Sequence, residues 1–362
     1  MVAVVGISEA ETGGDPESCI VNGFLVVVAN AWSKVIDYRR LIVHARGPRL
    51  RCNRGIGLRS CHGRVDRIGI LSHSQAESAT RSEHPQGTAM ASDYPPTAPA
   101  EESKAPRYLI LDTESVPDGK LVRLVKYPRE TLTDAEAIGR AQGEAREKNG
   151  SDFLPVSFQI PVSVCVVRVG ADFKLQSITC LGAPGFNPAE IVKKFWQGVA
   201  LYPEAELVTF NGRGFDMPLL ELAAFRYGYA IKSYLQRSRH RFQSNHFDML
   251  EWFTNHCAYR LAGGLDMLSK ILGKPGKMEI KGEQVYAMYL EGKKQEINDY
   301  CLFDTLDTYF VFLRTRVLTG QITLQQEQSL VAEAKEWITA KREEFPALEK
   351  YLANWGNWEP WP

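Results

Sequence analysis

The chain has 362 residues, of which 44% are hydrophobic and 24% charged, and its formal net charge is zero. These values are ordinary for a soluble globular protein. They exclude attraction to nucleic acid through overall positive charge, so binding of that kind would need a local groove. No segment reaches the roughly 20 apolar residues of a membrane span. The apolar residues 20–32 follow an acidic stretch, which does not fit a signal peptide. We therefore expect a cytoplasmic protein without membrane contact.

Cysteine usage agrees with this location. The seven cysteines are scattered and form no CxxC pair; they are Cys19, Cys52, Cys61, Cys165, Cys180, Cys257 and Cys301. We expect them to be small buried hydrophobic residues in a reducing compartment.

The chain changes character near residue 106. Residues 39–67 hold nine arginines and no lysine. Residues 74–106 are rich in Ser, Ala, Thr, Pro and Glu, a composition that buries too little apolar surface to offset its ordering entropy, which predicts disorder. Residues 1–89 have two interpretations: a basic arm that contacts phosphates, or a segment without a fold of its own, with Met90 as the natural start. The excess of arginine over lysine favours the second.

From residue 107 onward the pattern becomes regular. Short apolar runs bounded by turn residues predict strands at residues 107–113, 161–169, 174–181 and 206–210. The second and third would form an antiparallel pair across a turn at Gly170–Asp172. Helical patterns cover residues 131–148, 188–199 and 216–227, and then segments near 248–257, 264–272, 283–291, 294–318 and 322–344. This order predicts a mixed α/β sheet covered by helices.

Asp112 and Glu114 lie at the end of the first predicted strand. Alternation along an extended segment places both side chains on the same side. Two carboxylates beside an apolar strand are costly unless a cation binds them. The same Asp-x-Glu spacing recurs at residues 15–17 and 134–136, where exposure on the surface is a sufficient explanation.

A second polar element lies between a predicted strand and a predicted helix and reads Asn211-Gly212-Arg213-Gly214-Phe215-Asp216. Its glycines let the backbone approach a ligand, and a helix start offers free N–H groups. A phosphate-binding P-loop does not fit, because no Gly-Lys-Ser/Thr follows. For this stretch alone, a turn in which Asp216 caps the helix is an equally good explanation.

The third element lies inside a predicted helix and reads YCLFD. Tyr300 and Asp304 are four residues apart, so their side chains share one helical face. Taken alone, an ordinary amphipathic helix explains the pattern.

In this order, the three elements resemble the exonuclease domain of family B DNA polymerases, the tyrosine subtype of the DEDD exonucleases. The motifs of that family are D-x-E, N-x₃-[FY]-D and Y-x₃-D, matched here by DTE, NGRGFD and YCLFD. The chain is also similar to stand-alone bacterial proteins described as predicted polymerase-B-like 3′–5′ exonucleases, in LDTESVPD, LVTFNGRGFDMPLL, HFDMLEWF, LSKILGKPGK and INDYCLFDTLDTYFVFLR. Asp299 stands where the histidine subtype has its base. The resemblance covers about residues 107–320 and implies an RNase H-like fold with a mixed five-stranded sheet flanked by helices.

The resemblance also implies roles for the acidic residues. Asp112 would bridge two divalent cations, Mg²⁺ or Mn²⁺. Glu114 and Asp304 would hold the cation that carries the attacking water, and Asp216 would serve the second cation. Tyr300 would orient the water.

Residues around the carboxylates receive supporting roles from the same resemblance. Asn211 would contact the terminal nucleotide, within a substrate-binding loop that includes Gly212, Arg213 and Phe215. Asp248, in HFDML, would support the site from behind.

Other polar stretches remain open from the sequence. Residues 226–246 interleave cations with aromatic rings, which suits either a single-stranded end or a solvated connection. Residues 273–277 (GKPGK) are a second candidate phosphate-contact loop. The spacing of His246, Asp248, His256 and Cys257 fits no structural zinc pattern. The tryptophans at 355, 358 and 361 suggest packing or a loose end.

The sequence thus predicts three parts: an N-terminal segment at 1–106, an exonuclease domain at 107–320, and a C-terminal helical extension with a tail at 321–362. The predicted activity is metal-dependent hydrolysis of single-stranded DNA from its 3′ end, releasing nucleoside 5′-monophosphates. The alternatives are a 3′–5′ exoribonuclease and a non-catalytic nucleic-acid-binding module of the same fold. The expected partner is a single-stranded 3′ end of DNA.

Overall fold

The computed structural model describes residues 105–240, 245–278 and 282–360, together with the backbone of four strands before residue 45. It divides into two units, Met1–Ser92 and Asp93–Pro362. In the first unit, β3 pairs antiparallel with each of the other three strands. These strands are β1 (Ala3–Val5), β2 (Glu9–Thr12), β3 (Ser18–Ala29) and β4 (Trp32–His44). The side chains of the strands and nearly all of residues 45–106 lie outside the described part, so the absence of an independent fold and the disorder expected here stay predictions.

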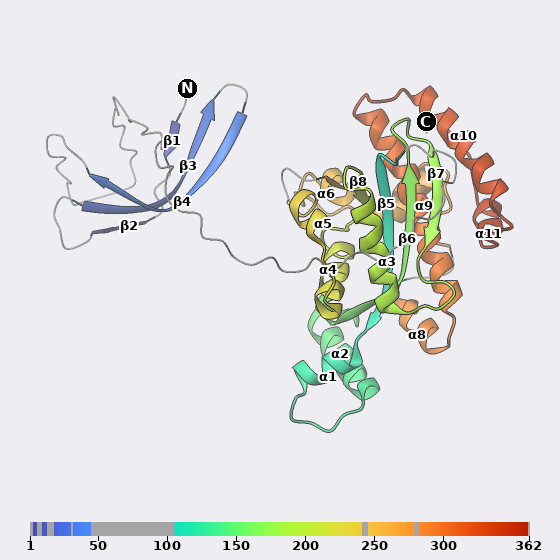
Figure 1. The fold of residues 1–362 in the computed structure, drawn as a ribbon, viewed down its shortest axis with the longest axis horizontal. Helices are drawn as coiled ribbons and strands as arrows, with labels where there is room; N and C mark the ends of the chain where they lie inside the picture. The colour runs from blue at the N-terminus through green and yellow to red at the C-terminus, as the bar shows by residue number, and fades with distance from the viewer. Residues whose placement is uncertain are drawn as a thin grey trace, which may run out of the picture. The chain divides into compact units, whose positions relative to one another are not determined.

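The second unit is built on a five-stranded sheet of order β7-β6-β5-β8-β9 (Figure 1). Its strands are β5 (Tyr108–Pro117), β6 (Gln159–Val169), β7 (Leu175–Cys180), β8 (Glu206–Thr209) and β9 (His246–Asp248). Strand β6 is antiparallel to both β5 and β7, whereas β8 runs parallel to β5 and β9 parallel to β8. The predicted mixed five-stranded sheet is therefore confirmed.

Strand β5 lies at the centre of the sheet, and its side chains alternate between the two faces. Tyr108 and Ile110 join one core cluster, and Leu109 and Leu111 join another. The strand was expected to end at residue 113, which is wrong. Pairing with β6 continues past a register shift after Glu114, so the acidic pair lies inside the strand, beside a bulge of the kind common at functional sites.

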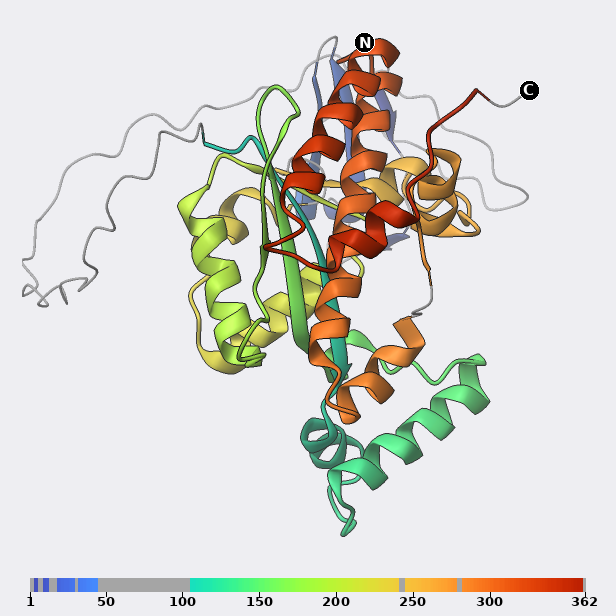
Figure 2. The same ribbon diagram turned by 90° about the vertical axis from the view of Figure 1, so that its right-hand side faces the viewer.

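Helices cover both faces of the sheet, as the edge-on view of Figure 2 shows. On one face lie α3 (Pro188–Leu201) and α4 (Asp216–Tyr227). On the other lies α9 (Lys294–Leu318), and α10 (Leu324–Ala340) and α11 (Leu348–Ala353) contribute to the same core cluster. Because α9 lies between the sheet and this outer layer, it is buried along most of its circumference, including polar residues such as Asp304 and Asp307.

The remaining described helices are short or peripheral. They are α1 (Gly119–Lys126), α2 (Asp134–Asn149), α5 (Lys232–Arg237), α6 (Met249–Phe253), α7 (Gly264–Ile271) and α8 (Val285–Leu290), with single 3₁₀ turns at Val156–Phe158 and Gly282–Gln284. Among the helices of the described residues, none combines the length and the hydrophobicity that a membrane span requires.

Most predicted helices are confirmed, and those at 216–227 and 294–318 agree to the residue. The helix expected near 248–257 is shorter, because Asn255, His256 and Cys257 adopt left-handed backbone angles. Successive residues in that region cannot continue a right-handed helix. Strand β9 and helices α1, α5 and α11 were not predicted.

Candidate active site

Three carboxylates from two elements converge on one point. Asp112 and Glu114 project from the face of β5 that α9 crosses, and Asp304 projects from α9. Ligand oxygens of the three lie within 4.8 Å of one another. The Sγ of Cys301 lies 3.3 Å from the backbone oxygen of Asp112, which fixes the helix directly against the strand. In the described residues, no second group of acidic, histidine or cysteine ligands gathers in this way.

The electrostatics of this cluster favour the binding of positive charge. Burial raises the pKa of Asp112 well above its usual range, and the charges of Cys301, Asp216 and Asp304 raise it further. Burial, and then Asp304, have the same effect on the pKa of Glu114. Burial raises the pKa of Asp304 to about 6. Buried carboxylates this close together repel one another, so a bound cation would relieve their cost.

Asp216 lies beside the cluster, as the first residue of α4. The hydroxyl of Thr113 donates a hydrogen bond of 2.6 Å to its Oδ1. Burial raises the pKa of Asp216 to about 7 although this bond lowers it. Phe215 occupies the N-cap position and no side chain caps the helix. The alternative explanation, Asp216 as a helix cap, therefore does not hold.

Tyr300 lies one helical turn before Asp304 on α9, as the four-residue spacing predicted. Its hydroxyl interacts with the Asp304 carboxylate and lowers the pKa of that group. Burial, and then the charges of Asp304 and Glu114, raise the pKa of Tyr300. The phenol therefore stays protonated and can donate a hydrogen bond next to the carboxylates.

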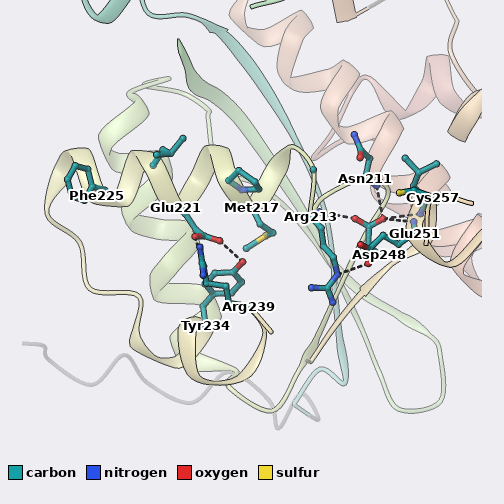
Figure 3. A pocket seen from close by; sticks show the side chains of 14 residues that line it. Asn211, Arg213, Met217, Glu221, Phe225, Tyr234, Arg239, Asp248, Glu251 and Cys257 are labelled. Atoms are coloured by element: carbon teal, nitrogen blue, oxygen red, sulfur yellow. Dashed lines mark hydrogen bonds and ion pairs between the residues drawn. The ribbon is translucent and has the colours of Figure 1, made fainter. Parts of the chain in front are cut away.

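The loop before α4 is held in place by Asp248. The backbone N–H groups of Asn211 and Arg213 donate to its two carboxylate oxygens, at 3.0 and 2.8 Å. The same side chain accepts from the N–H of Leu250 at the start of α6. Figure 3 shows this carboxylate between the loop and α6. Asn211 itself is exposed and has a left-handed backbone, with φ of 69°.

The glycines of the loop are needed for close approach. A Cβ atom at Gly212 would overlap the side chain of Thr209, whose Oγ1 accepts from the Gly212 N–H at 3.2 Å. Thr209 also contacts the Nε2 of His246 at 2.8 Å. Burial lowers the pKa of this histidine to about 3, so it is neutral. His246 thus has a packing role, in keeping with the absence of a zinc pattern.

Two side chains of the predicted substrate loop differ in their surroundings. The guanidinium of Arg213 donates to the backbone oxygen of His246 at 2.6 Å and lies 3.3 Å from Glu251, so it ties the loop to β9 and α6. Phe215 is partly exposed, and its ring centroid lies 5.7 Å from that of Phe153. Phe153, itself 47% exposed, was not predicted, because its place beside Phe215 depends on the packing of two segments distant in the sequence.

A cavity of about 790 Å³ borders Asn211 and extends along α4 (Figure 3). None of the three converging carboxylates lines it. Its charged groups are paired, as Glu221 accepts from Tyr234 and from Arg239 at 2.8 Å each. The cavity is therefore not a cationic groove.

The basic and aromatic stretch at 226–246 is largely tied to acidic side chains. Arg226 pairs with Asp118 and Arg237 pairs with Glu204, while Arg239 contacts Glu221 in the cavity described above. Residues 241–244 lie outside the described part. For the arginines that are described, these pairs favour a surface connection.

The loop at 273–277 contributes one lysine to the site and one to the core. The charge of Lys277 lowers the pKa of Glu114 and of Asp304, so this cation acts electrostatically on the carboxylates. Lys274 is instead buried, with its Nζ 4.1 Å from the ring centroid of Trp355, and burial lowers its pKa to about 8. Trp355 thus packs against the core.

Comparison with known proteins agrees with this geometry. Residues 151–355, more than half of the chain, match the model of a family described as "Predicted 3'-5' exonuclease related to the exonuclease domain of PolB". No curated protein matches the chain. The matched range contains Asp216, Tyr300 and Asp304 but begins after β5, so the convergence in space is what joins Asp112 and Glu114 to them. With its mixed sheet of RNase H-like type, the chain belongs to this family of predicted 3′–5′ exonucleases related to the PolB exonuclease domain.

Proposed function

We propose that this protein is a metal-dependent 3′–5′ exonuclease that removes nucleotides from single-stranded DNA. The observation that carries the proposal is the convergence of Asp112, Glu114 and Asp304 within 4.8 Å. Membership of the exonuclease family supports it for the second and third motifs.

The donor atoms fit Mg²⁺ or Mn²⁺, because hard cations prefer carboxylate oxygens. Asp112, Glu114, Asp304 and Asp216 would hold these cations: Asp112 would contribute to both, Glu114 and Asp304 to the first, and Asp216 to the second. Two such ions, when bound, activate water and stabilise the leaving oxygen. Two observations support this division: Asp216 is outside the group of three within 4.8 Å, yet its charge raises the pKa of Asp112 and of Glu114.

The other side chains would position water and substrate. The protonated hydroxyl of Tyr300 would orient the attacking water beside Asp304. Asn211, exposed on a loop fixed by Asp248, would contact the terminal nucleotide. The rings of Phe215 and Phe153 offer a surface on which a terminal base could stack. Lys277, the cation that acts on the carboxylates, would contact a phosphate. In these roles the chain would release nucleoside 5′-monophosphates.

Digestion of labelled oligonucleotides tests the proposal. A 5′-labelled single strand should shorten stepwise with Mg²⁺ or Mn²⁺ and stay intact with EDTA. A circular single strand of the same composition should survive, because it has no end. Cleavage of the circle would show an endonuclease, and binding without cleavage would favour the non-catalytic module.

Matched DNA and RNA strands in the same assay show which of the two nucleic acids is the substrate. We propose DNA as the substrate; faster digestion of RNA would establish the exoribonuclease instead, since a 2′-OH contact separates the two. We also propose a cytoplasmic location, in line with the scattered cysteines.

A further inference from the structure

Two cysteines face each other across neighbouring strands. Cys165 on β6 is the register partner of Cys180 on β7. The N–H of Leu181 donates to the oxygen of Val164 at 2.9 Å, which makes the cysteines a non-hydrogen-bonded pair. In an antiparallel sheet this is the closer type of pair, with Cα atoms about 4.5 Å apart, a separation that a disulfide accepts. The two Sγ atoms lie 3.0 Å apart.

This thiol pair connects the edge of the sheet with the carboxylate site. Cys180 is partly exposed on the edge strand β7, whereas Cys165 is fully buried. Cys165 is also the register partner of Asp112 on β5. Its sulfur lies 3.7 Å from the backbone oxygen of Asn298 on α9 and interacts with Cys301 on the same helix, the residue whose Sγ lies against the Asp112 oxygen.

We propose that Cys165 and Cys180 form a reversible disulfide when the protein meets a peroxide, and that this bond lowers the activity of the neighbouring carboxylate site. The disulfide itself is independent of the proposed function; its effect on activity rests on that function.

The chemistry begins at the accessible thiol. The Cys180 sulfur attacks one oxygen of hydrogen peroxide, the O–O bond breaks, and the released hydroxide leaves as water with the thiol proton. Cys180 is then a sulfenic acid. The Cys165 sulfur attacks it, the S–S bond forms, the S–O bond breaks, and a second water leaves with the Cys165 proton. Two electrons pass from the thiols to the peroxide.

The disulfide should change the geometry of the carboxylate site because α9 packs against Cys165. Cys165 contacts the backbone oxygen of Asn298 as well as Cys301, and α9 carries Tyr300 and Asp304. Forming the bond draws two sulfurs from 3.0 Å to about 2.05 Å. Shifts near 1 Å at a catalytic site can cost about a hundredfold in rate. We expect a loss of about tenfold, since only part of the movement reaches α9.

The test uses the full chain, reduced and then exposed to hydrogen peroxide. Free thiols are blocked with N-ethylmaleimide, and peptides are mapped by mass spectrometry without reduction. We expect a linked peptide containing Cys165 and Cys180 that disappears after dithiothreitol. Cys257, which is exposed, reports within the same sample on unspecific oxidation.

Activity and Mn²⁺ binding are measured on the same samples. Digestion of a 5′-labelled strand should slow about tenfold on oxidation and recover with dithiothreitol. The Cys180→Ser variant should retain full activity and resist peroxide. Mn²⁺ titration should show weaker binding after oxidation, and it reads the site even if the protein digests no nucleic acid.

Three results would overturn the proposal. They are a Cys180 sulfinic acid without any link, a link between Cys165 and Cys301 instead, and a Cys165–Cys180 link that leaves both activity and Mn²⁺ binding unchanged.

Discussion

The spacing Asp-x-Glu occurs on β5 and again at the start of α2, with opposite results. On β5, Asp112 and Glu114 are two positions apart in a strand, so they share one face and converge on Asp304. On α2, Asp134 pairs with Arg123 at 3.0 Å. Glu136 accepts from the N–H and the hydroxyl of Thr133 in a capping box.

The two regions differ in electrostatics as much as in geometry. Burial raises the pKa of Glu114, whereas hydrogen bonds from Thr133 lower the pKa of the exposed Glu136. Residues two apart do not face each other on a helix, but they do on a strand. The same Asp-x-Glu spacing therefore contributes to a helix cap in one setting and to a candidate metal site in the other.

The strongest test exchanges one acid in each region. Asp112→Asn should reduce digestion on the order of 10³-fold, because it removes the ligand assigned to both cations. Asp134→Asn is the matched control and should keep full activity. The readout is the initial rate on a 5′-labelled strand with Mn²⁺. Similar rates for both variants would contradict the assignment of the metal site to β5 rather than to α2.

The second test concerns the water-orienting role on α9. Tyr300→Phe should slow digestion about 10- to 100-fold and leave Mn²⁺ affinity unchanged, because only the hydroxyl is lost. Tyr289→Phe is the control, since Tyr289 packs against the same small cluster as Tyr300. Rates and Mn²⁺ titrations separate the effects; weakened Mn²⁺ binding would show that Tyr300 acts on the metal ligands instead.

The third test removes the cation that acts electrostatically on the β5 site. Lys277→Ala should raise KM by about tenfold, because a phosphate contact is lost. The pKa values of Glu114 and Asp304 should also rise, since Lys277 lowers both, which moves the rising limb of the pH–rate profile to higher pH. Lys270→Ala is the control, because Lys270 pairs with Asp266 on the surface. An unchanged KM and pH profile would contradict the assignment.

The fourth test follows the stability of the metal-free protein with pH. The pKa values of Asp304 and Asp216 are raised from 3.8 to about 6 and about 7. Between about pH 4 and 7 the folded state therefore binds more protons at these groups than the unfolded state, and their contribution to stability falls as pH rises.

Bound Mn²⁺ should offset this loss of stability at pH values at which the carboxylates are ionised. Saturating Mn²⁺ should raise Tm by about 5 to 10 °C at pH 8 and much less at pH 5. Comparing the Mn²⁺-induced shifts in Tm at the two pH values removes the contribution of groups that do not bind the metal. His246 is one such group, because its lowered pKa makes its contribution to stability rise with pH. In Asp112→Asn the difference should shrink. Equal shifts at both pH values would count against a carboxylate metal site.

The smallest effect is expected in the α2 region. Thr133→Ala removes the hydroxyl that accepts from the Glu136 N–H and donates to its carboxylate, and it should lower Tm by about 2 to 4 °C, while the rate of digestion stays the same. Thermal melts and the digestion assay measure the two. A loss of activity would mean that α2 contributes to the site.

Much of the fold follows from local patterns. The apolar runs at 161–169 and 206–210 and the helix at 294–318 were predictable because their periodicity extends over many residues. Strand β9 has three residues and α11 six, too short for any periodicity to register. The extension of β5 past residue 113 depends on its partner β6, which lies more than forty positions along the chain.

Part of the site was predictable for the same reason. Tyr300 and Asp304 share a face in any α-helix, and Asp112 and Glu114 share one in any strand. The supporting interactions were not predictable: the hydrogen bond from Thr113 to Asp216 and the effect of the Lys277 charge on Glu114 join residues more than a hundred positions apart.

By itself, the sequence determined the types of the longer elements, the order of the three motifs and the identity of the carboxylates. Taken singly, each carboxylate also had a non-functional structural explanation, and the cysteines were interpreted as scattered hydrophobic residues. The tertiary structure decided which Asp-x-Glu becomes a site, because only the packing of α9 on β5 brings Asp304 to Asp112. It also paired Cys165 with Cys180 through the register of β6 and β7. Both outcomes depend on contacts between distant segments, which no local pattern contains.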